Sequence, residues 1–429
     1  MRHSWLFAFF AACSSPSRLQ IELLVEEGTT WASNPTVTTL AIDLRTSTNS
    51  RPLLETAATE GSVTIPPVEV KTASKLVVSG YDASKKRIAT GSSIPFLGSD
   101  VAGYTLRVLV QRGGRAISLP GTLATAPATP VLAVMNARTL AFASSSSTQP
   151  VLEMYDLATY QPLSTRFTLS SAPASLLAQG DRILLVDGTR AEWLDTAAAT
   201  FEQATLPTGA LTGDLSGGKT WTTDDGVSLL VGATRAAGAP TKQVLVVETD
   251  TMRIATLATP RLGAGATWVP GVGLVVCGGA SALPALELLA PNASAAVTLA
   301  TPVDPADARA CATLASGRVL VAGGKLPDGT GAPTWLFDPK CKSDCAPTVW
   351  PSPAEVVAAP QLAAIGSLAF LVGQDSSGNI VGYELGASAA TAIALPTKRT
   401  TAAITLLPTG AIGIVGGASR LDQFVPTLD

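Results

Sequence analysis

The sequence is poor in the side chains that most enzymes use for acid–base chemistry. Its 429 residues include a single histidine, His3. Without histidine in the rest of the chain, a Ser-His-Asp triad, a histidine general acid and a histidine-bound zinc, copper or haem centre are excluded. The five cysteines show no CxxC spacing, so a cysteine-based zinc cluster is not expected either.

Charge and long apolar runs are also scarce. Asp, Glu, Lys and Arg make up 14% of the residues and the formal net charge is −3, whereas soluble chains carry roughly 25% charged residues. No dense Lys/Arg cluster offers a positive field for phosphate, so nucleic acid is not expected as a partner. The longest apolar stretch, residues 362–373, is shorter than the roughly 18 residues that a membrane-spanning helix needs.

The N-terminus has the order of an export signal. One cationic residue precedes a short apolar run, residues 5–10, and two alanines then stand directly before Cys13. This ending resembles the lipobox of bacterial lipoproteins; a plain signal peptide is the alternative. The resemblance implies that residues 1–12 are removed, that Cys13 carries lipid, and that residues 13–18 form a flexible tether. Because Ser14 follows the cysteine, it also implies the outer membrane, with membrane contact only through the lipid.

The remaining four cysteines suit an exported protein. Cys341 and Cys345 share one short turn, "CKSDC", so we expect a local disulfide there. Cys277 would then pair with Cys311. Four cysteines allow three pairings, and free buried thiols are the alternative.

A repeat dominates the chain after residue 113. Seven short apolar runs end in small residues, as in "LVVCGG", "VLVAGG" and "IGIVGG". The residues that mark these ends are 43–50 positions apart, and a period near 45 with strand-like runs and tight turns predicts a β-propeller of seven four-stranded blades. The markers are Ser144, Asp187, Gly232, Gly278, Gly323, Gly373 and Gly416.

The last repeat lacks a fourth strand. The fourth strands of other copies end in patterns such as "ATLPTG" and "AIALPTK", and "AISLPGT" at residues 116–122 has the same pattern at the other end of the repeat region. A closed ring must join its first and last blades without leaving an unpaired edge. We therefore predict that Ile117–Leu119 pair beside Gln423–Val425 in the seventh blade.

The runs "GRVLVAGG" and "GLVVCGG" resemble Kelch-type propellers, including the central domain of galactose oxidase-like proteins. The resemblance covers residues 114–429 and implies a propeller that presents loops to a partner. The copper site of galactose oxidase needs histidine ligands, so that activity is not expected here. Residues 19–113 form a separate unit, in which alternating apolar positions indicate an immunoglobulin-like or fibronectin-like β-sandwich that acts as a spacer.

Carboxylates and tryptophans are the remaining candidate site residues. Asp224, Asp225, Asp304, Asp307 and Asp375 are expected first as turn residues. Two such carboxylates close together would suit a sugar-cleaving site. Calcium is the one metal that such turns would accommodate. Trp221 and Trp268, 47 residues apart, are expected to pack in the core or to form an aromatic ligand surface.

The sequence thus predicts an all-β protein with no catalytic residue and no required cofactor. We expect a monomeric, non-enzymatic envelope lipoprotein whose propeller binds or scaffolds a protein or glycan partner. The alternative is a carboxylate-dependent hydrolase or lyase that acts on envelope polysaccharide.

Overall fold

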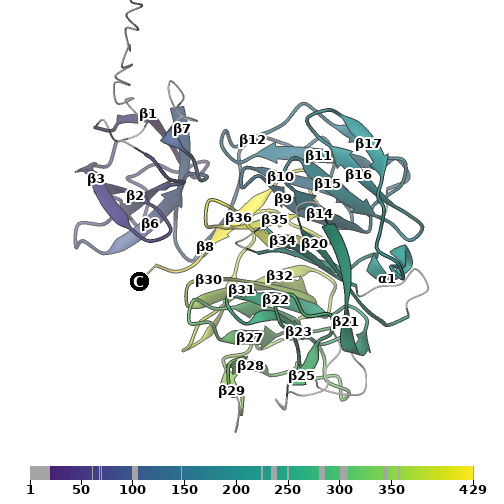
Figure 1. The fold of residues 1–429 in the computed structure, drawn as a ribbon. Coiled ribbons are helices and arrows are strands. Elements are labelled where there is room, and N and C mark those ends of the chain that lie inside the picture. Colours follow the sequence, from purple (N-terminus) through teal and green to yellow (C-terminus); the bar gives the residue numbers. More distant parts are fainter. Residues whose placement is uncertain are drawn as a thin grey trace, which may run out of the picture.

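The protein consists of a curved N-terminal sheet and a seven-bladed β-propeller (Figure 1). The computed structural model describes residues 20–428 except 60, 67, 69, 99–104, 146, 224–225, 233–238, 249–250, 280–285, 300–307, 342–345 and 356. Within these residues the one helix is α1 (Thr212–Leu215), and the other elements are strands. The all-β prediction and the seven-bladed propeller are confirmed.

The N-terminal unit is one hydrogen-bonded sheet of seven strands in the order β3-β2-β5-β6-β7-β1-β4. We expected the two separate sheets of a sandwich; here the sheet continues from one half to the other and forms a half-barrel around an apolar core. The join is narrow, because β6 and β7 pair at two positions, Ala89 with Arg112 and Thr90 with Gln111. The strands are β1 (Gln20–Val25), β2 (Thr39–Arg45), β3 (Ser50–Ala57), β4 (Gly61–Thr64), β5 (Lys75–Tyr81), β6 (Arg87–Ser92) and β7 (Thr105–Arg112).

Each blade is an antiparallel sheet that runs from an inner strand to an outer strand. In the first blade the outer strand is divided into two short pieces, β12 and β13, which both pair with β11. Blade 1 comprises β9 (Pro130–Met135), β10 (Thr139–Ser144), β11 (Val151–Asp156), β12 (Gln161–Pro162) and β13 (Phe167–Thr168). Blade 2 comprises β14 (Ser175–Gln179), β15 (Arg182–Val186), β16 (Ala191–Asp195) and β17 (Thr200–Gln203). Blade 3 comprises β18 (Lys219–Thr222), β19 (Ser228–Val231), β20 (Thr241–Glu248) and β21 (Thr251–Arg261).

The remaining blades follow the same plan. Blade 4 comprises β22 (Gly265–Val269), β23 (Gly273–Cys277), β24 (Leu286–Leu289) and β25 (Val297–Leu299). Blade 5 comprises β26 (Ala310–Thr313), β27 (Val319–Ala322), β28 (Thr334–Phe337) and β29 (Thr348–Trp350). Blade 6 comprises β30 (Ala358–Ile365), β31 (Leu368–Gln374), β32 (Ile380–Leu385) and β33 (Ala390–Ile393). Blade 7 comprises β34 (Ala403–Leu406), β35 (Ile412–Val415), β36 (Asp422–Val425) and β8 (Arg115–Ser118).

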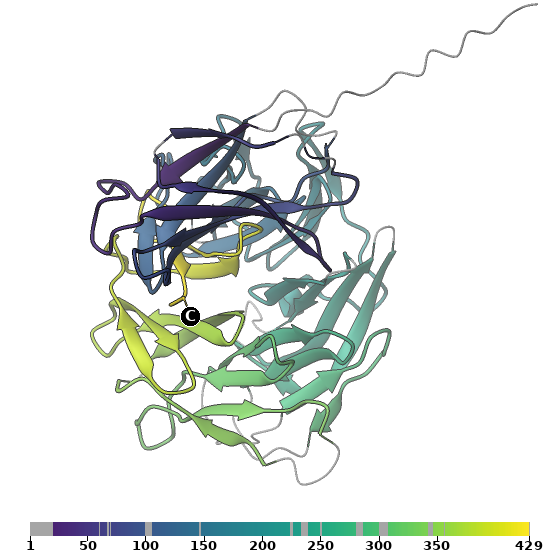
Figure 2. The same cartoon turned by 90° about the vertical axis from the view of Figure 1, so that its left-hand side faces the viewer.

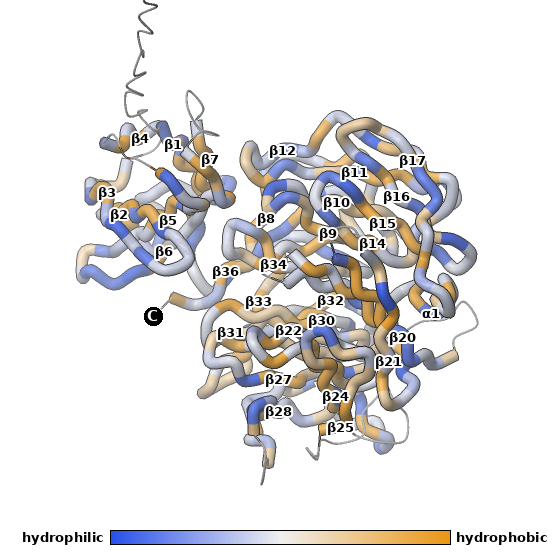
Figure 3. The backbone as a smooth tube through the Cα atoms, viewed as in Figure 1, coloured by the Kyte–Doolittle hydropathy of each residue, from blue (hydrophilic) through white to orange (hydrophobic). Residues whose placement is uncertain are grey.

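Apolar layers between neighbouring blades hold the ring together. Seven buried clusters each join one blade to the next, and the inner strands contact one another around the circle from β9 to β34 and back to β9. Figure 2 shows the resulting ring, and Figure 3 shows apolar residues along the blade strands. Burial of these side chains on both faces of each blade explains the nearly continuous apolar runs in the sequence.

Strand β8 closes the ring as predicted. It pairs antiparallel with β36, and Ile117 lies opposite Gln423. The backbone N–H of Leu119 extends the ladder by donating to Leu421 O at 2.8 Å. Because β8 directly follows the N-terminal sheet, the same connection places that sheet against the propeller. Ile94 and Leu109 of the sheet share an apolar cluster with the blades that meet at the closure.

Candidate functional site

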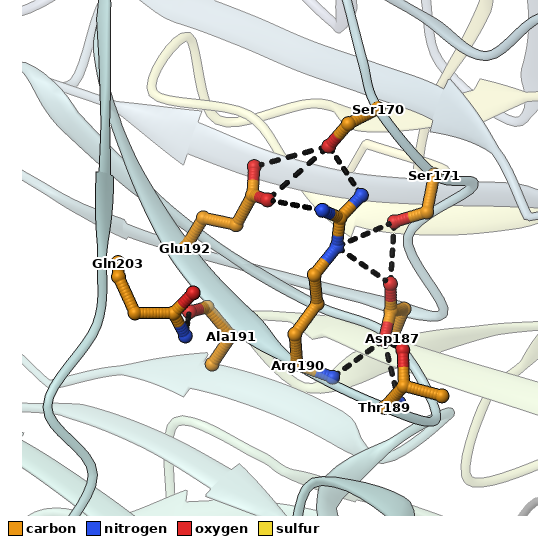
Figure 4. A network of polar contacts seen from close by, with 8 residues as sticks. All are labelled: Ser170, Ser171, Asp187, Thr189, Arg190, Ala191, Glu192 and Gln203. Atoms are coloured by element: carbon orange, nitrogen blue, oxygen red, sulfur yellow. Dashed lines mark hydrogen bonds and ion pairs between the residues drawn. The ribbon is translucent and has the colours of Figure 1, made fainter.

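Blade 2 carries a dense network of charged side chains (Figure 4). Arg190 lies between two acids, with Nε 3.3 Å from Asp187 Oδ2 and Nη1 3.0 Å from Glu192 Oε1. Ser170 donates to Glu192, and Ser171 donates to Asp187. Ser170 and Ser171 belong to the segment that enters from blade 1, so the network ties that segment to blade 2.

Asp187 is fully supplied with donors. Burial alone would raise its pKa, but hydrogen bonds from Ser171, from the backbone and side chain of Thr189 and from the backbone of Arg190 lower the pKa to about 2. The cavity beside the network measures about 10 Å³, roughly the room needed by one water. A sugar does not fit there, so this pair of acids stabilises the fold and offers no glycosidase site.

The lowered pKa of Asp187 predicts a pH-dependent effect of Asp187→Asn. A carboxyl whose pKa is about 2 in the folded protein and about 3.9 when unfolded stabilises the fold above the higher value and loses this contribution as pH falls through the lower one. We expect the variant to be less stable than the native chain at pH 7, and the difference to shrink between about pH 4 and pH 2. Denaturant unfolding of both proteins across this range measures it. A difference that persists at pH 2 would show that the carboxylate charge is not responsible.

Buried ion pairs in blades 4 and 7 repeat this design. Arg261 Nη2 lies 2.8 Å from Glu287 Oε1, and Arg399 Nη2 lies 2.8 Å from Asp422 Oδ2; all four side chains are almost completely buried. In both pairs the arginine Nη1 also donates to the first carbonyl oxygen of a glycine doublet, at 2.5 Å. These contacts hold the end of the second strand to the segment that enters from the preceding blade.

A polar residue on the third strand contacts the entering segment in five blades. We call these contacts the third-strand clamps. None of these contacts was predicted from the sequence. The clamp residues are Glu153, Glu192, Gln243, Glu287 and Asp422.

Of the acids proposed as turn residues, one lies in the described part of the chain. Asp375 Oδ1 accepts hydrogen bonds from the backbone N–H groups of Ser377 and Asn379, both at 2.8 Å. The bonds from Asn379 are the main cause that lowers its pKa. Asp375 is therefore a turn residue, while Asp224, Asp225, Asp304 and Asp307 lie outside the described residues. No group of three or more His, Cys, Asp or Glu side chains suited to a metal occurs among the residues that the structure describes.

The two candidate tryptophans lie on inner strands of neighbouring blades. Trp221 is on β18 and Trp268 on β22, and both are half-buried against the apolar cluster between blades 3 and 4. This placement agrees with core packing. Neither residue lines the pocket described below.

The proposed Cys277–Cys311 disulfide is not formed. Both residues are buried free thiols, although the predicted proximity is present, because both lie in the apolar cluster between blades 4 and 5. The Cys311 thiol donates to Val275 O at 3.9 Å. Burial raises the pKa of Cys311 well above its ordinary value, which favours the thiol over the reactive thiolate. Cys341 is disulfide-bonded; Cys345 lies outside the described residues, so its pairing stays a prediction.

A larger pocket, of about 360 Å³, lies between the N-terminal sheet and the propeller. One wall is the outer face of the sheet, and the other is formed by turns of blades 1, 6 and 7 with the chain segment after β36. We call it the interdomain pocket. Its lining residues are Arg45, Val77, Arg87, Thr90, Gly91, Ser92, Leu109, Tyr160, Ile365, Gly366, Ser367, Leu368, Thr409, Gly410, Ala411, Gln423, Val425, Pro426, Thr427 and Leu428.

Hydrogen bonds between the two units fix the walls of this pocket. Lys75 Nζ donates to Pro408 O at 2.6 Å, and Gln423 Nε2 donates to Gln111 Oε1 at 2.6 Å. Gly91 is required at the sheet wall, since a Cβ there would lie 2.3 Å from Leu109 O on the neighbouring strand. The two units that form the pocket are therefore joined by direct hydrogen bonds.

This pocket was not predicted from the sequence. Its walls combine residues more than 300 positions apart, such as Arg87 and Gln423. No local sequence pattern predicts that such distant residues line one pocket. The residues of the predicted signal and tether, including Cys13, lie outside the described part of the chain, so lipidation stays a prediction. No helix in the described part is long and apolar enough to span a bilayer.

Comparisons with known proteins give a fold likeness and no family. No family model matches the chain, and no curated protein matches it. Among solved structures, a chain from the crystal structure of the mitotic checkpoint complex is similar, with a TM-score of 0.45 and 12% identity. The match covers 73% of this chain and 95% of that chain.

Proposed function

We propose that this protein is a non-enzymatic binding or scaffolding module, with the propeller as a rigid platform for a protein or glycan partner. The observation that carries the proposal is the distribution of carboxylates. The acids among the third-strand clamps accept hydrogen bonds or form ion pairs within the propeller. No Asp or Glu is among the described residues that line the interdomain pocket. A glycosidase needs two acids about 5–9.5 Å apart in a site open to sugar, and the described clefts offer cations and hydroxyls instead.

We further propose that the module is held at the outer membrane of a bacterial envelope by lipid on Cys13. The support is the lipobox-like ending at residues 10–13. Multiple acyl chains would keep the module stably at the membrane.

Cross-linking capture from intact cells tests both parts. We expect the native protein to recover one envelope protein or glycan in high yield, and a Cys13→Ala variant to lose both the membrane fraction and the partner. In parallel, the purified chain incubated with the captured or total envelope polysaccharide should release no new reducing ends. Release of sugar fragments would overturn the non-enzymatic assignment in favour of a hydrolase or lyase, and capture of the same partner by Cys13→Ala would overturn the anchor.

A further inference from the structure

We propose that the interdomain pocket binds a small anionic sugar, a molecule that carries a carboxylate or phosphate group together with hydroxyls. The inference goes beyond the proposed binding of a macromolecular partner. It does not depend on the identity of that partner.

The positive charge on the sheet wall favours an anionic ligand. Arg45 lies directly opposite Lys75 in the register of β2 and β5, and like charges at such positions destabilise a sheet. Asp43 Oδ2 lies 3.6 Å from Arg45 Nη2 and neutralises the charge of that arginine. Arg87, on β6, forms no ion pair with any residue that the structure describes. Lys75 donates to Pro408 O and does not line the pocket, so Arg87 is the lining cation that has no counter-charge among the described residues. A guanidinium fork suits carboxylate and phosphate alike.

Polar atoms on the propeller wall favour hydroxyl groups on the same ligand. Gln423 Oε1 and Thr409 Oγ1 are buried and have no hydrogen-bond partner among the described residues, with the two residues 2% and 7% exposed. Buried polar groups without partners are rare and costly, and each needs a partner that the chain itself does not supply. A sugar hydroxyl donates to an amide oxygen and exchanges hydrogen bonds with a threonine hydroxyl.

The pocket also has the right size and a polar surround. Its volume of about 360 Å³ falls in the range of small-molecule sites. Further hydroxyls line it at Ser92, Ser367 and Thr427, while Val77 and Leu368 provide apolar surface. Apolar patches beside a few converging polar groups are what the faces and edges of a sugar ring require.

Isothermal titration calorimetry of the purified full-length chain tests the inference. The probes are glucuronate and glucose 6-phosphate, with glucose as the uncharged control and acetate as the control without hydroxyls. We expect at least one sugar anion to bind tenfold or more tightly than both controls. Binding of glucuronate alone would identify the anion as a carboxylate, and binding of glucose 6-phosphate alone as a phosphate.

Two pocket variants and a matched control separate binding from folding. Arg87→Gln should weaken binding of the sugar anion at least tenfold, whereas Arg318→Gln, in a turn of blade 5 that does not line the pocket, should not change it. Thr409→Val should weaken binding several-fold and leave the unfolding midpoint unchanged or raised, because it removes an unpaired buried hydroxyl. The proposal is overturned if neither sugar anion binds, if glucose binds as tightly, or if Arg87→Gln and Thr409→Val both bind like the native chain.

Discussion

Arg399→Met is expected to lower the free energy of unfolding by about 3–5 kcal/mol, the cost of leaving a buried ion pair without one partner. Asp422 is completely buried, and Arg399 is the one cation that pairs with it among the described residues, with Nε at 3.1 Å and Nη2 at 2.8 Å from Oδ2. Ser118 of the closing strand also donates to Asp422, at 2.8 Å from Oδ1. The substitution therefore weakens the blade in which the two ends of the propeller region meet.

Denaturant unfolding of the native chain and three variants measures this effect. Arg318→Met removes a half-buried surface arginine that forms no ion pair among the described residues, and it should change stability by no more than about 0.5 kcal/mol. Adding Asp422→Asn to Arg399→Met should restore part of the loss, since it removes the uncompensated charge while an oxygen remains for Ser118. If Arg399→Met were no more costly than Arg318→Met, the third-strand clamps would contribute little to stability.

Phe424→Ala is the second substitution with a large expected effect, again about 3–5 kcal/mol. Phe424 on β36 is completely buried, and its ring stacks on Phe370 of blade 6 with centroids 4.1 Å apart and an interplanar angle of 15°. Truncation would leave a cavity in the apolar layer between blades 6 and 7. It would also loosen the strand to which β8 pairs.

Phe201→Ala is the matched control, because Phe201 lies on an outer strand with 44% of its surface exposed. This control should cost well under half as much as Phe424→Ala in thermal or denaturant unfolding. Equal losses for the two variants would contradict the assigned burial of Phe424. Retention of a single cooperative transition in Phe424→Ala would show that the ring stays closed despite the cavity.

The parts of the fold that repeat could be predicted from the sequence. Strand runs that end in small residues recur every 43–50 positions, so the blade number could be counted. The missing fourth strand of the last copy then pointed to Ile117 and its neighbours. The observed strand β8 runs from Arg115 to Ser118 and pairs with β36, so the predicted pairing of the two segments was right, while the strand begins two residues earlier than predicted.

The features that the sequence did not reveal all depend on contacts between distant segments. Whether the N-terminal strands form two sheets or one is decided by the short pairing of β6 with β7, which alternating apolar positions do not encode. The thiols of Cys277 and Cys311 were correctly placed together, but proximity alone does not make a disulfide. The interdomain pocket combines residues of the N-terminal sheet, such as Arg87, with residues of blade 7, such as Gln423, and these are adjacent in space only in the folded chain.

Closure of the ring by β8 is the central feature of this fold. It completes blade 7, places the N-terminal sheet against the propeller and thereby forms the interdomain pocket. Hydrogen–deuterium exchange at the backbone amides of Gly114 and Leu119 tests it most directly. Their N–H groups donate to Val425 O at 2.9 Å and to Leu421 O at 2.8 Å. We predict that both amides exchange as slowly as those of the inner strands. Exchange at the rate of an exposed linker, with the inner strands still protected, would contradict closure by this strand.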